Sequence, residues 1–424
     1  MLTFGEKQLS WKVLLPQLLI LALSLIIGVR DHRLMLIAFA FSLVNMVMGR
    51  NLYVICQLFF LLPFTVIYKS GPTTSSYFAY TIILFSAFLV FQSKVNVGKI
   101  ALIAIYLLVG LTNKFDIWLK MISGMIILLY FVKNVSRDSF KYIAISFAVG
   151  VIISSIIGLD KMSSPLLSEY YKSFNNEYIA GDVVYRFSGL YYDPNYYSIT
   201  VACSIFFITS LIVVKDIKAI VGIPLVIALT YFGTISYSRL FLVAIILIYA
   251  SQTWDLIWYS RYRLLVFLFV LVLLIVGIPL LRNTMYYGYY NERLNTEDIS
   301  GGRLSIWKMY MEQIFSSASL FLFGVGVGGK LLNHVGAHNT FIEALYDLGL
   351  FGFILYVITF FKVLKSNSLL YRRSYKNYTF LFVFLIMITT LGVLTMNDMM
   401  FYLMVIWCSF NIEYPKVRLS KSIV

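Results

Sequence analysis

Side chains that can move protons or bind anions gather in the polar segment 282–339, which lies between long apolar runs. The segment contains two of the chain's three histidines and three arginines: His334, His338, Arg282, Arg293 and Arg303. Almost everywhere else the chain is apolar. A chain that keeps its chemistry in one such segment is expected to work where a membrane meets water.

His338 is the best single candidate for a proton-transfer role. The unperturbed pKa of histidine is about 6.5, close to working pH. The sequence Thr340-Phe-Ile-Glu343 has the form of a capping box and predicts a helix start directly after His338. The dipole of that helix should lower the pKa of His338 and favour the neutral form that a general base needs. A purely capping role explains His338 about equally well.

The carboxylates of the following helix, Glu343 and Asp347, lie one turn apart and can orient His338 or hold an arginine. A metal site built from His334 and His338 is a weaker hypothesis, because no third ligand stands at a suitable spacing. We therefore predict no metal and no other cofactor.

Three further candidates are arginines in or beside the apolar body: Arg186, Arg239 and Arg303. A guanidinium carries forked donors that match phosphate oxygens, and it keeps its charge. Two or more converging would suit a diphosphate. For any single arginine the ordinary alternative is an ion pair, and four carboxylates are available: Asp182, Asp193, Glu343 and Asp347.

The glycine-rich run 324–330 fits both G-x-G-x-x-G and the start of a P-loop, but neither interpretation holds. Leu331 replaces the hydroxyl residue that would bind magnesium in a P-loop, and no βαβ pattern surrounds the run. Two interpretations remain, a re-entrant turn or a nest of backbone amides near a phosphate. Tyrosines are dense in 170–197 and 286–290, as expected for sugar stacking or for an interfacial aromatic belt.

The elements that must position these residues are membrane helices. The chain has a mean hydropathy of +0.86, with 60% apolar and 12% charged residues, which excludes an ordinary soluble globular fold. We predict an all-α, polytopic integral membrane bundle of about 12–14 transmembrane helices, forming one domain over residues 1–424. The predicted spans are 11–28, 34–49, 52–68, 77–91, 99–112, 116–132, 142–158, 194–214, 219–236, 239–253, 264–281, 340–361, 378–395 and 398–411.

Two segments exceed ordinary turn length, 159–193 and 282–339, and function is expected there. Asp193-Pro194 is typical of a helix start, with an N-cap acceptor before a proline at the first helical position. Within the second segment, the apolar spacing of Gly302–Ser317 predicts an amphipathic helix on the membrane surface.

The formal charge of +15 is a topology signal rather than a sign of nucleic-acid binding. With both termini placed in the cytoplasm, cytoplasmic loops carry about 20 Lys and Arg against 5 acids, as the positive-inside rule predicts. The opposite side is nearly neutral. Both long loops then lie outside the cytoplasm, and Arg30 and Arg33 are the exceptions to the rule.

Three blocks of sequence resemble the O-antigen ligase/polymerase family of bacterial envelope glycosyltransferases. The first runs from Arg186 to Asn195 (RFSGLYYDPN) and the second is Ser236-Tyr-Ser-Arg239. The third is Gly302-Arg-Leu-Ser-Ile-Trp307, followed by Phe323–Gly326 and His338-Asn339. The resemblance covers about 186–352; the first 150 residues match only in being apolar and helical.

The resemblance implies a metal-independent inverting transferase that uses sugars carried on undecaprenyl diphosphate, with its active site outside the cytoplasm. It implies that Arg186 and Arg303 hold the diphosphate and that His338 activates the acceptor hydroxyl. Arg239, Glu343 and Asp193 are assigned supporting roles. The RX10G spacing of some polymerases is absent from Arg186, Arg293 and Arg303, and this absence leaves polymerase and ligase both open.

The leading hypothesis is a polymerase of the bacterial cytoplasmic membrane that joins lipid-linked oligosaccharide units into a capsular, exopolysaccharide or O-antigen chain. Its expected partners are the undecaprenyl-diphosphate-linked oligosaccharide, the growing polysaccharide, membrane lipid, and a chain-length regulator and flippase of the same pathway. The alternatives are a ligase with the same donor and a flippase for lipid-linked sugar. A flippase is disfavoured because few charges lie within the spans and no internal repeat is visible.

Overall fold

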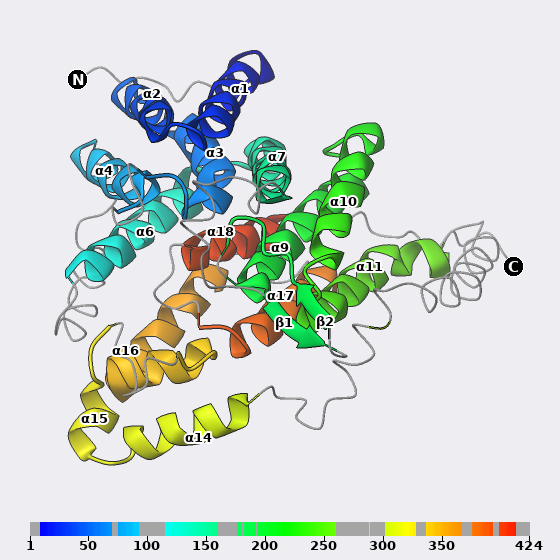
Figure 1. Cartoon of the computed structure of the whole chain (residues 1–424). Coiled ribbons are helices and arrows are strands. Elements are labelled where there is room, and N and C mark those ends of the chain that lie inside the picture. The colour runs from blue at the N-terminus through cyan, green and yellow to red at the C-terminus, as the bar shows by residue number, and fades with distance from the viewer. Residues whose placement is uncertain are drawn as a thin grey trace, which may run out of the picture.

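The computed structural model describes residues 9–69, 75–92, 115–159, 176–179, 182–191, 193–259, 288, 302–327, 336–365, 375–392 and 398–412. Apart from one short hairpin the described chain is helical (Figure 1). This confirms the predicted all-α membrane bundle. Five of the described helices are long and apolar enough to cross a membrane.

The bundle is formed by helices that coincide closely with the predicted spans. Their bounds are α1 Trp11–Gly28, α2 Met35–Val47, α3 Asn51–Leu61, α4 Tyr77–Phe91, α6 Phe115–Asn134, α7 Phe140–Leu159, α9 Pro194–Val213, α10 Ala219–Thr234, α11 Arg239–Tyr259, α16 Thr340–Lys365, α17 Tyr375–Thr389 and α18 Asp398–Asn411. The predicted spans 99–112 and 264–281 lie outside the described residues.

Connecting contacts define two ends of this bundle. At one end, a pocket is lined by Leu9 before α1, by Asn134, the last residue of α6, and by Lys141 in α7. Arg137 pairs with Asp216 across 3.5 Å at the same end, linking the turn before α7 to the turn after α9. We call this the basic end, because the helices meeting there also carry Arg50, Lys133, Lys215 and Lys218. The N-termini of α9, α11 and α16 lie at the opposite end.

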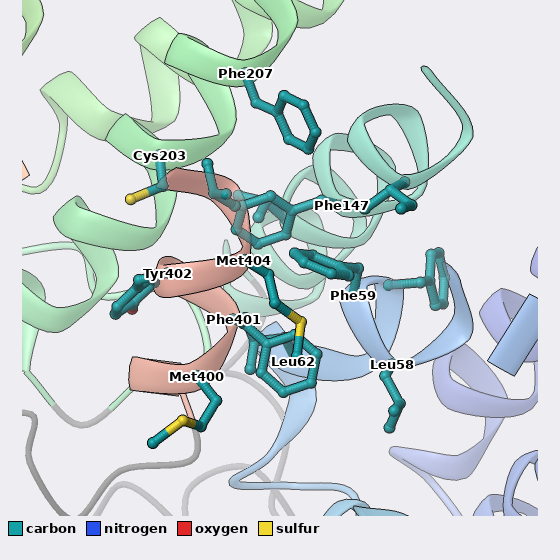
Figure 2. Packing of buried hydrophobic residues seen from close by; sticks show 14 of the residues in the cluster. Leu58, Phe59, Leu62, Phe147, Cys203, Phe207, Met400, Phe401, Tyr402 and Met404 are labelled. Atoms are coloured by element: carbon teal, nitrogen blue, oxygen red, sulfur yellow. The ribbon is translucent and has the colours of Figure 1, made fainter. Parts of the chain in front are cut away.

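Aromatic side chains fill the centre of the bundle. Phe59 of α3 is fully buried and meets Phe147 edge-on with ring centroids 5.6 Å apart. It also meets Phe401 of α18 edge-on at 5.0 Å (Figure 2). Helix α7 comes close enough to α3 that a Cβ at Gly150 would stand 2.3 Å from the carbonyl oxygen of Phe60. Small residues at such crossings allow helices to pack tightly where lipid supplies no hydrophobic driving force.

A second, smaller hydrophobic cluster lies outside this core. It joins α14 (Arg303–Ile314) and α15 (Ala318–Phe323) to the first half of α16. Four residues are buried in it: Tyr310, Ile314, Ala337 and Tyr346. In Figure 1, α14 and α15 lie along the lower edge of the molecule, beside α16. The predicted amphipathic helix is therefore present; Tyr310 and Ile314 of its apolar face are buried in this cluster, whereas Leu304 is exposed.

Helix α16 is interrupted at Gly349, which has a left-handed φ of 65°. The break frees two carbonyl groups, and the glycine-rich run satisfies them. Val325 N–H donates to the carbonyl of Tyr346 at 3.0 Å, and Gly326 N–H donates to that of Asp347 at 2.9 Å. The described part of the run is therefore a turn docked into a broken helix, and these two amides are not available to a phosphate.

The first long loop contains an antiparallel hairpin that the sequence did not suggest. Its strands are β1 (Asn176–Ile179) and β2 (Asp182–Tyr185), with Asn176 opposite Tyr185. The hairpin leads directly into Arg186. The predicted loop 159–193 is thus partly a β-ribbon, and residues 160–175 lie outside the described ranges.

Candidate active site

Arg186 is held in place by the turn between α10 and α11. Its Nε donates to the carbonyl of Ser236 at 3.3 Å, and one terminal nitrogen donates to Oδ1 of Asn195 at 3.3 Å. The side chain is 7% exposed. A backbone hydrogen bond from Phe187 to Ile235, 3.2 Å long, fixes the same two segments together. The sequence blocks around Arg186 and Ser236 are therefore neighbours in space.

Asn195 connects this pair of segments to the start of α9. Its Oδ1 also accepts a 3.0 Å hydrogen bond from Ser238, the residue before Arg239. Asp193 caps α9 as predicted, accepting from the amide of Asn195 at 2.6 Å, with Pro194 at the first helical position. Arg186, Asp193 and Arg239 are thus fixed at one end of the bundle by short-range capping and turn contacts.

Arg303 is the first residue of α14, after Gly302 with a left-handed φ of 79°. Its guanidinium interacts electrostatically with Asp193, Arg239, Arg186 and Tyr196. Burial, helped by the two other arginines, lowers the pKa of Arg303. Because the ordinary value is about 12.5, Arg303 stays cationic at neutral pH. Three guanidinium groups and one carboxylate therefore share a half-buried region.

His338 lies immediately before the cap of α16, with a left-handed φ of 47° that is unusual for a residue other than glycine. It is half-buried and interacts with Asp193 and Arg303. Burial lowers the pKa of His338 and Arg303 lowers it further, whereas Asp193 raises it. The predicted shift toward the neutral imidazole is present, but burial rather than the helix dipole is its main cause.

The supporting carboxylate Glu343 lies at the edge of the same region. Glu343 and Asp193 both interact electrostatically with Tyr196, as does Arg303. The Tyr196 hydroxyl donates to the carbonyl of Gly392 at 2.9 Å, in the turn after α17. All six candidate site residues are thus brought together around the N-termini of α9, α11, α14 and α16. Their chemical roles remain predictions.

The capping box predicted at Thr340 is wrong. Asn339 caps α16 instead, its Oδ1 accepting from the amides of Phe341 at 3.0 Å and Ile342 at 3.1 Å. The hydroxyl of Thr340 donates to the carbonyl of Leu391 at 2.6 Å and ties α16 to the end of α17. Because Asn339 is the cap, the helix starts one residue earlier than a Thr340 cap requires, and Glu343 falls one residue beyond the reciprocal position.

Several other sequence candidates have structural roles or lie outside the described residues. Tyr191 and Tyr197 are buried, and the Tyr197 hydroxyl is 2.6 Å from that of Ser155. These two tyrosines therefore support the bundle and are not open to a sugar ring. His334, Arg282 and Arg293 fall outside the described ranges.

Sequence reasoning gave no positioning role to three residues that shape the site: Asn195, Tyr196 and Trp307. Asn195 and Tyr196 follow Asp193-Pro194 and lie in the first turn of α9. Trp307 stands one turn after Arg303, and its indole N–H donates to the carbonyl of Ala337 at 2.9 Å. The spacing of four residues was the available signal, since it places Arg303 and Trp307 on one face of α14.

A comparison with known protein families supports the resemblance seen in the sequence. Residues 223–357 match the family model described as O-antigen ligase. Over this segment the chain is similar to that family. The match includes Arg239, Arg303 and His338. It begins after Arg186 and Asp193, which are therefore not part of it. No curated protein and no solved structure matches the chain.

The several apolar helices, together with the similarity of residues 223–357 to the O-antigen ligase family, indicate a multi-pass membrane protein. The family points to a glycosyltransferase-like activity on lipid-linked glycans, with membrane lipid as the surrounding partner. The O-antigen ligase domain supplies one half of the candidate site, and the segment 186–195 before it supplies the other.

Proposed function

We propose that this protein polymerises oligosaccharide repeat units carried on undecaprenyl diphosphate into a capsular, exopolysaccharide or O-antigen chain. One observation carries the proposal: three guanidinium groups and one imidazole converge in a half-buried region, from four separate segments between Arg186 and His338. Like charges so close together repel one another unless an anion lies between them. A diphosphate would meet that requirement.

Arg186, Arg303 and Arg239 would bind the donor's diphosphate and stabilise the charge that develops on it as it leaves. A terminal nitrogen of Arg239, Nη1, is buried without a hydrogen-bond partner among the described residues. A buried donor of this kind normally has a partner, and a phosphate oxygen would provide one. We therefore include Arg239 with the two arginines expected from the sequence.

Neutral His338 would take the proton of the acceptor hydroxyl. The hydroxyl oxygen attacks the anomeric carbon, the new glycosidic bond forms on the face opposite the phosphate, and the carbon–oxygen bond to the diphosphate breaks. The leaving undecaprenyl diphosphate keeps the electron pair of the broken bond, and the proton rests on His338. Asp193, which favours protonated His338, would stabilise the imidazolium so formed. The anomeric configuration is inverted.

The site is proposed to face the extracytoplasmic side of the bacterial cytoplasmic membrane, with both chain termini in the cytoplasm. Its location opposite the basic end of the bundle supports this orientation, because positively charged loops stay in the cytoplasm. Donor units delivered by a flippase and a chain-length regulator of the same pathway are the proposed partners.

Substitution of the central residues tests the function directly. Purified protein is incubated with the lipid-linked repeat unit and a chelator, without nucleotide, and the products are separated by length. Wild-type protein should give a ladder, and His338→Ala should reduce its rate by about 10²–10⁴-fold, the usual contribution of a general base. Arg303→Ala should also abolish long products.

Arg33→Ala is the matched control, because Arg33 is an exposed arginine near the same end of the bundle but outside the site. It should leave the ladder intact. Long products from folded His338→Ala protein would show that the imidazole has no part in glycan joining.

A ligase that transfers finished glycan from undecaprenyl diphosphate to another acceptor is the second candidate, favoured by the description of the matching family. The lipid-linked glycan that accumulates in a deletion strain distinguishes a polymerase from a ligase. A deletion strain that accumulates single lipid-linked repeats has lost a polymerase, and one that accumulates long lipid-linked polymer has lost a ligase.

A further inference from the structure

The candidate site is assembled from two separately packed parts of the molecule. Arg186, Asp193 and Arg239 stand on segments that pack into the large core through neighbours such as Phe187 and Phe241. Arg303 and His338 instead belong to the small cluster of α14, α15 and the first half of α16. The distance between the phosphate-binding Arg303 and the base His338 must therefore be set within the small cluster.

One hydrogen bond ties the helix of Arg303 to the residue before His338. Trp307 lies four residues after Arg303, on the same face of α14. Its indole N–H donates to the carbonyl oxygen of Ala337 at 2.9 Å. Ala337 immediately precedes His338 and is 1% exposed. On the other side of His338, Asn339 caps α16.

The backbone at His338 is held in a conformation that it would not adopt unaided. A left-handed φ of 47° is disfavoured for a side chain with a Cβ. Residues in such conformations persist only when their surroundings fix them. Here the fixing contacts are the indole of Trp307 at Ala337 and the cap at Asn339. Trp307 also holds the first turn of α14, which carries Arg303.

We propose that Trp307 is a positioning residue whose indole N–H sets the separation of the Arg303 guanidinium and the His338 imidazole. The proposal rests on the proposed function, in which those two groups act on one substrate. A nucleophile and its reaction partner must be held about 3–3.5 Å apart, and small displacements are costly. An indole that ties α14 to the residue before His338 controls that geometry without touching the substrate.

Removal of the N–H alone is the sharpest test. Trp307 is replaced by 3-benzothienylalanine, which keeps the shape of the indole and substitutes sulfur for the N–H. A hydrogen bond contributes about 1 kcal/mol, so we expect kcat to fall about five- to tenfold with KM little changed. Trp307→Phe is the genetically encoded second variant, and the same analogue at Trp11 is the control, since Trp11 packs on Tyr142 at the basic end.

A second measurement separates positioning from general support of the fold. The rate at which diethyl pyrocarbonate modifies His338 is followed against pH by peptide mass spectrometry, which requires no transferase activity. In the wild-type protein the midpoint should lie below 6.5, because burial and Arg303 lower the pKa of His338. When the link is lost, Arg303 and His338 move apart and the midpoint should rise.

A higher midpoint in both Trp307 variants, but not in the Trp11 control, supports the positioning role. An unchanged midpoint, even with a lower kcat, overturns it, because a change in the separation of Arg303 and His338 must change the pKa of His338. If wild-type protein joins no glycans while the midpoint still rises, the proposed function fails and the positioning of His338 stands.

Discussion

The large core and the small cluster of α14–α16 are built on different principles. Helices of the large core are apolar on all sides, so that lipid-facing and buried side chains look alike in the sequence. The small cluster has only four buried residues among those that the structure describes, Tyr310, Ile314, Ala337 and Tyr346. Many interchangeable apolar contacts stabilise the large core, whereas a few specific contacts stabilise the small cluster. The candidate site lies where they meet, so stability and activity should respond to different substitutions.

Phe59→Ala should give the largest loss of stability. Phe59 is fully buried between Phe147 and Phe401, and removal of such a ring leaves a cavity that costs about 3–5 kcal/mol. The measurement is the free energy of unfolding in detergent, together with the turnover of the protein that remains folded.

Leu23→Ala is its control, because Leu23 lies on α1 with 57% of its side chain exposed. Leu23→Ala should lower the free energy of unfolding much less than Phe59→Ala does. The comparison of the two regions would fail if folded Phe59→Ala protein had lost turnover in proportion to its stability.

Gly349→Ala should act next most strongly, and on the small cluster. A Cβ at Gly349 would stand 2.4 Å from the carbonyl oxygen of Leu322 and would also meet a left-handed φ of 65°. Strain and overpacking together should cost about 2–4 kcal/mol and displace α15 from α16. Turnover should be lost while the bundle stays folded, as measured by product ladders and by limited proteolysis around α14.

Gly49→Ala separates the two causes, because Gly49 has the same φ of 65° but no neighbour within 4 Å of its Cβ position. It should show the backbone strain alone and keep full turnover. Intact α14 and full turnover in Gly349→Ala would mean that the close approach of α15 and α16 is not needed.

Asp193→Asn should give the smallest and most specific effect. Asparagine keeps the N-cap of α9 but removes the negative charge that raises the pKa of His338. The pKa of His338 should therefore fall further below 6.5, and the acid limb of the pH–rate profile should move to lower pH by up to about one unit. A shift to higher pH would show that Asp193 does not face His338.

Much of the helical framework was predictable from local pattern. The spans around α1, α4 and α9 agree with the structure to within one or two residues, because backbone groups in lipid must be satisfied within a helix. The start of α9 at Asp193-Pro194 was also predictable from the sequence, because an N-cap depends on only two or three adjacent residues. The capping box at Thr340 failed because Asn339 offered a competing acceptor one residue earlier.

The sequence alone determined that this chain spans a membrane and where most of the described helices lie, and it singled out arginines and a histidine near helix ends as candidates for its chemistry. These properties depend on hydropathy and short-range hydrogen bonding. Only the tertiary structure decided that Arg186, Arg239, Arg303 and His338 meet, that Gly349 breaks α16 to receive the glycine-rich turn, and that Trp307 reaches the residue before His338. Such contacts join distant segments, and the spacing of residues within one segment does not specify them.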